Sequence, residues 1–229
     1  MRRYLFLPIV GIMLALFFIV LIFMVPFLLF GIIGRTLNRF GLPWYGFLLF
    51  LTFSLIGSTI NFPLWKIKTD VPVFVMRYAY FMGIPYPVPS IESRESYTTV
   101  YMNLGGAVLP LVLSLYLLLA NPDAVPVSIF AAILISVLTY FLSKPVQGLG
   151  IVVPGFIPPV LTALIALLIG GDYAPVVAYV GGTIGTLLGA DLFHKNDFKK
   201  LGAPSVSIGG AGTFDGIFLT GLIALLLAS

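Results

Sequence analysis

The stretch from Gly181 to Asp191 has the sequence GGTIGTLLGAD and closes an apolar run that begins near Tyr173. Its glycines recur at every fourth position, at Gly181, Gly185 and Gly189, so on a helix they share one face. Small residues at this spacing let another helix backbone approach closely inside a membrane. The run nevertheless ends in a carboxylate, which costs at least roughly 2.5 to 3.5 kcal/mol in hydrocarbon. The stretch predicts a membrane helix whose acidic group is paired, solvated in a cavity, or used.

The composition of the whole chain agrees with this class. The 229 residues are 60% hydrophobic and 9% charged, with a mean hydropathy of +1.13, whereas soluble domains carry about 25% charged residues. We therefore expect an all-α polytopic protein of the cell membrane, with residues 1–229 forming a single membrane domain. Cysteine is absent, which excludes disulfides and thiol chemistry.

Seven apolar runs predict about seven transmembrane helices. Pro154, Pro158 and Pro159 in the fifth run predict a broken helix of the kind that lines a cavity. The predicted spans are about 4–34, 43–61, 104–120, 125–142, 151–169, 173–193 and 212–228.

The basic residues sort by side when these seven spans alternate across the membrane. One face receives ten lysines and arginines, and the other receives only Arg35 and Arg39. Such asymmetry predicts a cytoplasmic N-terminus and an external C-terminus. The net charge of +4 is thus explained by membrane orientation, and we expect no nucleic-acid partner.

The segment 62–101, between the second and third spans, carries seven charged residues. Val71–Phe81 and Tyr97–Tyr101 are rich in β-branched and aromatic residues, and a turn-rich stretch, Gly83–Ser90, lies between them. This pattern predicts a small extramembrane β-hairpin.

A second aspartate, Asp215, lies near the start of the seventh span. In the predicted topology Asp191 lies near the cytoplasmic end of the inward-running sixth span, so both carboxyls lie at the cytoplasmic side of consecutive antiparallel helices. Consecutive elements usually pack together, and Gly189, Gly212 and Gly216 favour a close approach. The two carboxyls are therefore expected to meet.

Structural roles explain the same residues as well. Asp215 or Thr213 can cap the seventh helix, where the helix dipole favours an anion. The glycines can form an anion-binding nest, and the alternation in Ser205–Ile208 fits a short strand. A catalytic pair and an ion or proton site are the competing interpretations.

Two further polar residues support these interpretations. His194, the only histidine, shares a helix face with Asp191, although a loop role is the commoner one. Lys144 is a candidate counter-ion, although it can also extend to the membrane interface. No metal, phosphate-binding or nucleophile motif is present, and no cofactor is expected.

Several motifs resemble a prokaryotic family of multi-pass membrane proteins catalogued as a domain of unknown function. The resemblance covers most of the chain and is most specific at the C-terminal motif. The motifs are Asn103-Leu104-Gly105-Gly106, Ser143-Lys144-Pro145, Gly189-Ala190-Asp191-Leu192 and the stretch from Leu201 through Gly209 to Gly216.

The layout of Asp191 and Asp215 is also similar to that of the intramembrane aspartyl proteases, presenilin and signal peptide peptidase. In those families, too, one aspartate lies on an inward-running helix and the other on the next, outward-running helix. The motif residues differ, since Ala190 stands where those families have tyrosine. The resemblance implies a presenilin-like fold and a hydrolase that uses both aspartates on a membrane-embedded peptide or lipid. A transporter or channel with carboxylate sites, and a non-catalytic membrane subunit, are the alternatives.

Overall fold

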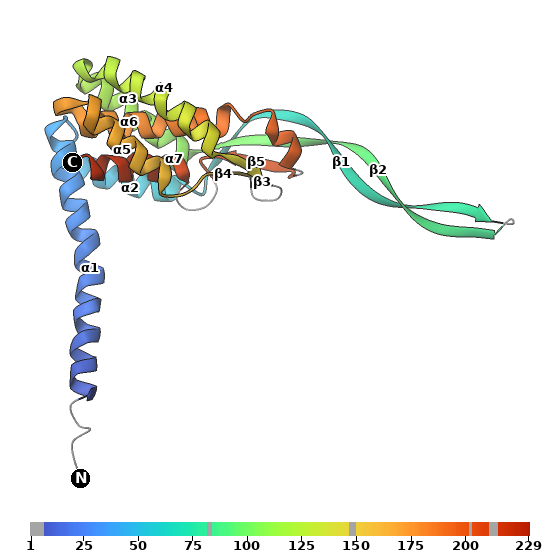
Figure 1. Ribbon diagram of the computed structural model, residues 1–229, viewed down its shortest axis with the longest axis horizontal. Coiled ribbons are helices and arrows are strands. Elements are labelled where there is room, and N and C mark those ends of the chain that lie inside the picture. The colour runs from blue at the N-terminus through green and yellow to red at the C-terminus, as the bar shows by residue number, and fades with distance from the viewer. Residues whose placement is uncertain (1–6, 82–83, 147–149, 202, 211–214) are drawn as a thin grey trace, which may run out of the picture.

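The computed structural model describes residues 7–81, 84–146, 150–201, 203–210 and 215–229. In this part of the chain the helices gather in a bundle, from which helix α1 and a long β-hairpin project in different directions (Figure 1). The elements are α1 (Leu7–Arg39), α2 (Trp44–Gly57), β1 (Asn61–Phe81), β2 (Ile84–Asn103), η1 (Leu104–Val108), α3 (Leu109–Ala120), η2 (Pro122–Ala124), α4 (Val125–Leu142), β3 (Lys144–Val146), β4 (Gly150–Val152), α5 (Ile157–Ile169), η3 (Gly171–Tyr173), α6 (Ala174–Thr186), η4 (Leu187–Leu192), η5 (Asp197–Leu201), β5 (Ser205–Ile208) and α7 (Gly216–Leu227).

Each of the seven apolar runs contains a helix, and the chain is a mostly helical membrane protein. In the described residues three segments are long and apolar enough to cross a membrane: Ile12–Arg39, Pro122–Leu142 and Gly171–Leu192. The apolar helices in 44–57, 104–120, 157–169 and 216–227 are shorter. Large apolar side chains cover the outward surfaces of α1 and α4, as expected where lipid replaces water.

The fifth run differs from its prediction. Helix α5 begins only at Ile157 and places Pro158 and Pro159 in its first turn, where the missing N–H groups have no helical partner to lose. The residues before it form β4, which pairs with β3 in an antiparallel ladder. The prediction of a broken helix is therefore wrong, because these prolines start the helix and do not interrupt it.

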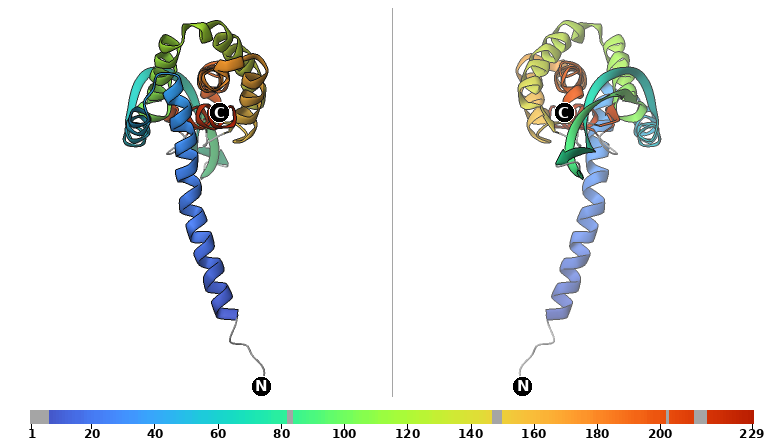
Figure 2. Two further views of the ribbon diagram at one scale, coloured as in Figure 1. Left: turned by 90° about the vertical axis from the view of Figure 1, so that its left-hand side faces the viewer. Right: turned by 90° about the vertical axis from the view of Figure 1, so that its right-hand side faces the viewer.

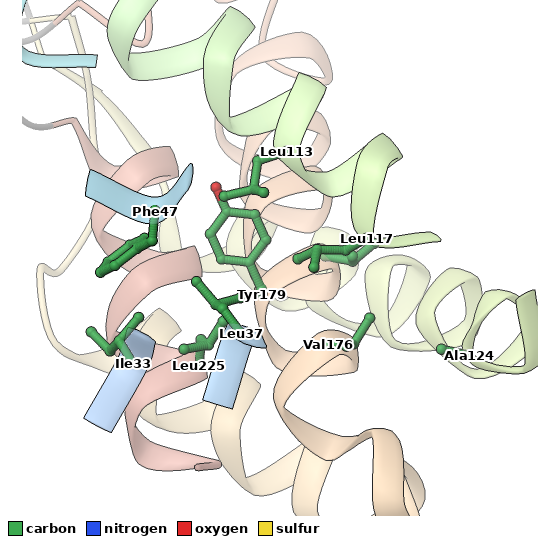
Figure 3. Packing of buried hydrophobic residues seen from close by; sticks show 10 residues of the cluster. Ile33, Leu37, Phe47, Leu113, Leu117, Ala124, Val176, Tyr179 and Leu225 are labelled. Carbon is green, nitrogen blue, oxygen red and sulfur yellow. The ribbon is translucent and has the colours of Figure 1, made fainter. Parts of the chain in front are cut away.

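Helix α6 is the centre of the bundle, and the other helices curve around it and α7 (Figure 2). Every α6 residue except Pro175 and Ile184 is buried. Tyr179 packs among apolar side chains from α1, α2, α3 and α7, which include Leu37, Phe47 and Leu113 (Figure 3). This packing fixes the orientation of α6 and therefore the position of its C-terminal end.

The predicted hairpin is confirmed but is longer than expected. Strands β1 and β2 pair from Asn61↔Asn103 to Phe81↔Ile84, so the turn predicted at Gly83–Ser90 is wrong from Ile84 onward. Pro85, Pro87 and Pro89 occupy alternate positions of β2. Alternate positions direct their nitrogens to the same edge of the strand. Strand β5 pairs only with Thr99–Met102 of β2, so three prolines can face the unpaired edge of β2 farther out without losing ladder bonds.

The base of the hairpin continues into a third strand. Strand β5 pairs in parallel with β2, from Thr99↔Ser205 to Met102↔Ile208, which confirms the strand predicted from the alternation in this segment. Because β2 lies between β1 and β5, the sheet connects the hairpin to the segment that precedes α7.

Candidate functional site

Asp191 lies in a π-helical turn that extends α6. Over Leu187–Leu192 the helix is wider than an α-helix, and the backbone N–H of Phe193 donates to the carbonyl oxygen of Leu188 at 2.9 Å. Such turns are rare and recur at functional sites because the extra residue reorients the side chains that follow. Asp191 is half-buried at this turn.

Glycine allows this turn to lie close to its neighbour. A Cβ atom on Gly189 would overlap the hydroxyl of Thr139 and the carbonyl of Ser136, both on α4. Gly185 faces Ile135 of the same helix at 2.7 Å from the position of a Cβ atom. The glycine face predicted from the sequence is therefore present, but its partner is α4. The contact between α6 and α7 is made instead by Gly182.

Asp215 caps helix α7, as one of the structural interpretations predicted. It has an extended backbone, with φ −77° and ψ 166°, and its carboxylate accepts a hydrogen bond from the backbone N–H of Gly216 at 2.6 Å. The backbone amide of Gly209 also faces this carboxyl. The cap holds Asp215 at the N-terminus of α7. It leaves the carboxylate able to bind other groups, because a carboxylate has two oxygens and about four acceptor sites.

The structure brings the two aspartates to one cavity. Asp191 and Asp215 both line a space of about 140 Å³, and their carboxyl groups are close enough for their charges to interact. A water molecule occupies about 30 Å³ in the liquid, so the space admits several waters or part of a substrate. The other lining residues come from β4, η5, β5 and the segments around β5: Gly150, Ile151, Leu201, Ala203, Ser205, Val206, Ser207 and Gly210.

An amide cluster holds the β5 wall of this cavity. Buried Asn103 accepts from the N–H of Gly106 at 2.8 Å and donates to the carbonyl of Ser58 at 2.7 Å. It also donates to Asn61 at 3.2 Å, and Asn61 accepts from the hydroxyl of Ser207 at 2.6 Å. Ser207 was not among the residues that the sequence singled out, and its only signal was the strand-like alternation around it.

The glycine after β5 explains why the strand stops at the cavity. Gly209 has φ +73°, and a Cβ atom there would stand 2.6 Å from the Cβ of Ala107 in η1. Only glycine adopts this conformation readily in so tight a space. The turn at Gly209 directs Gly210 along the cavity wall, beside Ser207 and Asn61.

The remaining sequence candidates lie in different places. His194 is buried; its Nδ1 lies 3.1 Å from the carbonyl oxygen of Gly189, and its ring packs on Tyr140 with 4.6 Å between the centroids. Lys144 is exposed in β3 and does not line the cavity. Gly216 starts α7, while Gly212 and Thr213 lie outside the described residues. The described residues contain no group of three potential metal ligands.

A family comparison is consistent with the motifs around both aspartates. Residues 55–227, which include the hairpin, helices α3 to α7 and the cavity, match the family described as "protein of unknown function (DUF1614)". The chain belongs to this family. No curated protein and no solved structure matches the chain. Because the family description assigns no activity, the functional argument rests on the cavity itself.

Proposed function

We propose that this member of the family is an intramembrane aspartyl hydrolase with Asp191 and Asp215 as its catalytic carboxyls. The observation that supports this proposal is the shared cavity, which holds both groups and has room for water. The proposal includes seven membrane spans with a cytoplasmic N-terminus, as the sorting of basic residues predicts. Under that topology the aspartates share the layout of the presenilin-like proteases.

The mechanism follows from two carboxyls that share one proton. Like charges a few ångströms apart disfavour double ionisation, so one group is a carboxylate and the other a carboxylic acid. The carboxylate takes a proton from water as the water oxygen attacks the substrate carbonyl carbon, and the acid donates its proton to the carbonyl oxygen. When the resulting diol collapses, the C–N bond breaks as the first group returns its proton to the leaving nitrogen. The second group takes a proton from one diol hydroxyl, whose oxygen becomes the carbonyl of the acid product.

The substrate we favour is an extended segment of a membrane-embedded peptide. Strand β5 pairs with β2 on one edge, and its other edge pairs with no strand in the part of the chain that the structure describes. Ser205, Val206 and Ser207 of this strand line the cavity. An extended peptide can add to such an edge through backbone hydrogen bonds, which would place its carbonyls beside the carboxyls. A lipid ester fits the same chemistry.

Cleavage of a reporter tests this proposal. A single-span fluorogenic peptide, reconstituted in vesicles with purified protein, is compared for the wild type, Asp191→Asn, Asp215→Asn and Asp172→Asn. The control residue Asp172 lies exposed at the other end of α6. We expect Asp172→Asn to cleave normally and each of the other variants to lose at least about 100-fold, the lower range for general acid–base groups. Equal cleavage by all four proteins would exclude Asp191 and Asp215 as the catalytic groups, whereas no cleavage by the wild type would favour a non-catalytic membrane subunit.

A specific feature of α6 supports a second candidate, a proton or cation transporter. The buried hydroxyls of Tyr179, Thr183 and Thr186 have no hydrogen-bond partner of good geometry, although the first two lie near each other. They recur every three to four residues along one face of the helix that ends at Asp191. Proton uptake into vesicles under a membrane potential, present in wild type and absent in Asp191→Asn, would favour transport over hydrolysis.

A further inference from the structure

Helix α1 leaves the bundle beside two connected grooves. One groove, of about 600 Å³, lies between α1, α2 and α7 and has almost only apolar walls, among them Phe30, Phe47 and Leu222. The other, of about 660 Å³, continues along α1 to Trp44. Phe27 and Phe30 line both grooves. A long apolar surface therefore leads to the C-terminal end of α1.

The second groove ends in positive charge. Arg35, Asn38 and Arg39 line it, and neither arginine has an acidic partner among the described residues. Gly31 leaves space for one of them, since the Arg35 guanidinium lies 4.0 Å from where a Cβ of Gly31 would stand. The guanidinium therefore turns back along α1 into the groove. A cation near hydrocarbon is favourable there when an anion shares the site.

We propose that these two connected grooves bind one anionic phospholipid of the surrounding bilayer. The phosphate contacts Arg35 and Arg39, Asn38 donates to a headgroup oxygen, and an acyl chain fills the apolar groove between α1 and α7. Guanidinium groups bind phosphate through paired hydrogen bonds, and basic pockets between membrane helices bind anionic headgroups. The occupant is a lipid because the charged end and the apolar groove are continuous, a combination that matches one amphipathic molecule.

This site is separate from the aspartate cavity. Helix α7 connects the two, because Asp215 caps its start while Leu222, Ile223 and Leu226 form the groove wall. The rise along the helix from Asp215 to Leu222 and Leu226 is about 10 to 17 Å. Lipid binding is therefore independent of the proposed hydrolase activity, and its test requires no substrate.

Tryptophan quenching by brominated lipids tests the proposal directly. The chain has two tryptophans, and a Trp65→Phe background leaves Trp44, which lines the groove and is 59% exposed, as the single reporter. The full-length protein is placed in vesicles with a small fraction of brominated phosphatidylglycerol or of brominated phosphatidylcholine. We expect phosphatidylglycerol to quench Trp44 at a several-fold lower mole fraction.

Three variants then locate the site. Arg35→Gln and Arg39→Gln should each reduce the preference about fivefold, the effect of one basic residue near an anionic surface. Gly31→Leu keeps both charges and favours the helix but fills the groove, so it should also abolish the preference. The control Lys66→Gln, on exposed β1, should retain it. Equal quenching by both lipids in the parent, or an unchanged preference in the arginine variants or in Gly31→Leu, would overturn the proposal.

Discussion

Gly182 of α6 lies directly against Gly221 of α7, where a Cβ on Gly182 would stand 3.2 Å from the Cα of Gly221. No side chain separates the two backbones at this point. The same two helices carry Asp191 and Asp215 at the cavity, so the crossing sets how far apart the carboxyls lie. A small-residue contact inside the bundle thereby determines the geometry of a site at its edge.

Gly221→Val should separate these helices. The new Cβ would overlap the Thr183 hydroxyl and approach the carbonyl oxygen of Tyr179 at 3.3 Å, and overpacking of this kind costs about 1–3 kcal/mol. Thermal unfolding in detergent, followed by circular dichroism, should show a lower midpoint. The matched control is Gly216→Val in the same helix, where a Cβ meets no atom within 4 Å. Equal midpoints for the two variants would contradict the packing argument.

The two functions of Asp215 can be separated by substitution. Asparagine caps a helix as well as aspartate does, whereas alanine costs roughly 1 kcal/mol. Asp215→Asn should therefore unfold at the wild-type temperature and Asp215→Ala at a lower one. If Asp215 is also catalytic, both variants lose reporter cleavage. An Asp215→Asn protein that cleaves normally would leave the residue with its capping role alone.

Hydropathy predicted the helices well because each apolar run must satisfy its own backbone hydrogen bonds in lipid. It did not predict the start of α5, since proline both begins and breaks helices, and only the pairing of β3 with β4 decides between these roles. The turn of the hairpin was also predicted to be longer than it is, because residue types alone were used to place it. Pro85, Pro87 and Pro89 signal a turn by residue type, but their alternate spacing is compatible with the part of β2 that has one unpaired edge.

The site was predictable where the signal was local. Asp191 and Asp215 stood out because carboxylates are rare in apolar segments, and Gly181, Gly185 and Gly189 formed the expected face. The identity of the partner helix could not be read from the local sequence. The glycine spacing shows that another backbone approaches this face of α6, but it does not show which helix that backbone belongs to. The cavity wall was missed for the same reason, since Ser207 reaches Asn61 only through the folded sheet.

Asn103→Ala should weaken the cavity wall as well as the fold. It leaves the N–H of Gly106 and the carbonyl of Ser58 without their partner, and each buried unsatisfied group costs about 1–3 kcal/mol. Asn121→Ala provides the comparison, because Asn121 donates to the carbonyls of Phe40 and Leu117 at the other end of the bundle. Both variants should unfold earlier. Only Asn103→Ala should increase deuterium exchange in β5, and similar exchange in both would contradict the assigned role of the cluster.

Thr186→Val tests whether the unpartnered hydroxyls of α6 serve a function. The Thr186 hydroxyl is buried without a hydrogen-bond partner, so a methyl group in its place removes a desolvation cost and should leave stability unchanged or higher. Thr139→Val is the matched control, because the Thr139 hydroxyl donates to Ile135 at 2.8 Å and lies 3.2 Å from the Gly185 carbonyl.

Loss of that bonded hydroxyl should cost roughly 0.5–1.5 kcal/mol, measured as a lower unfolding midpoint. A protein retains an unsatisfied buried group at a stability cost when the group has another use. A Thr186→Val variant that is more stable than the wild type but has reduced proton uptake or reporter cleavage would therefore show that these hydroxyls support the activity of Asp191. A Thr186→Val variant less stable than Thr139→Val would show instead that the hydroxyl has a structural partner, and the functional interpretation of these side chains would fail.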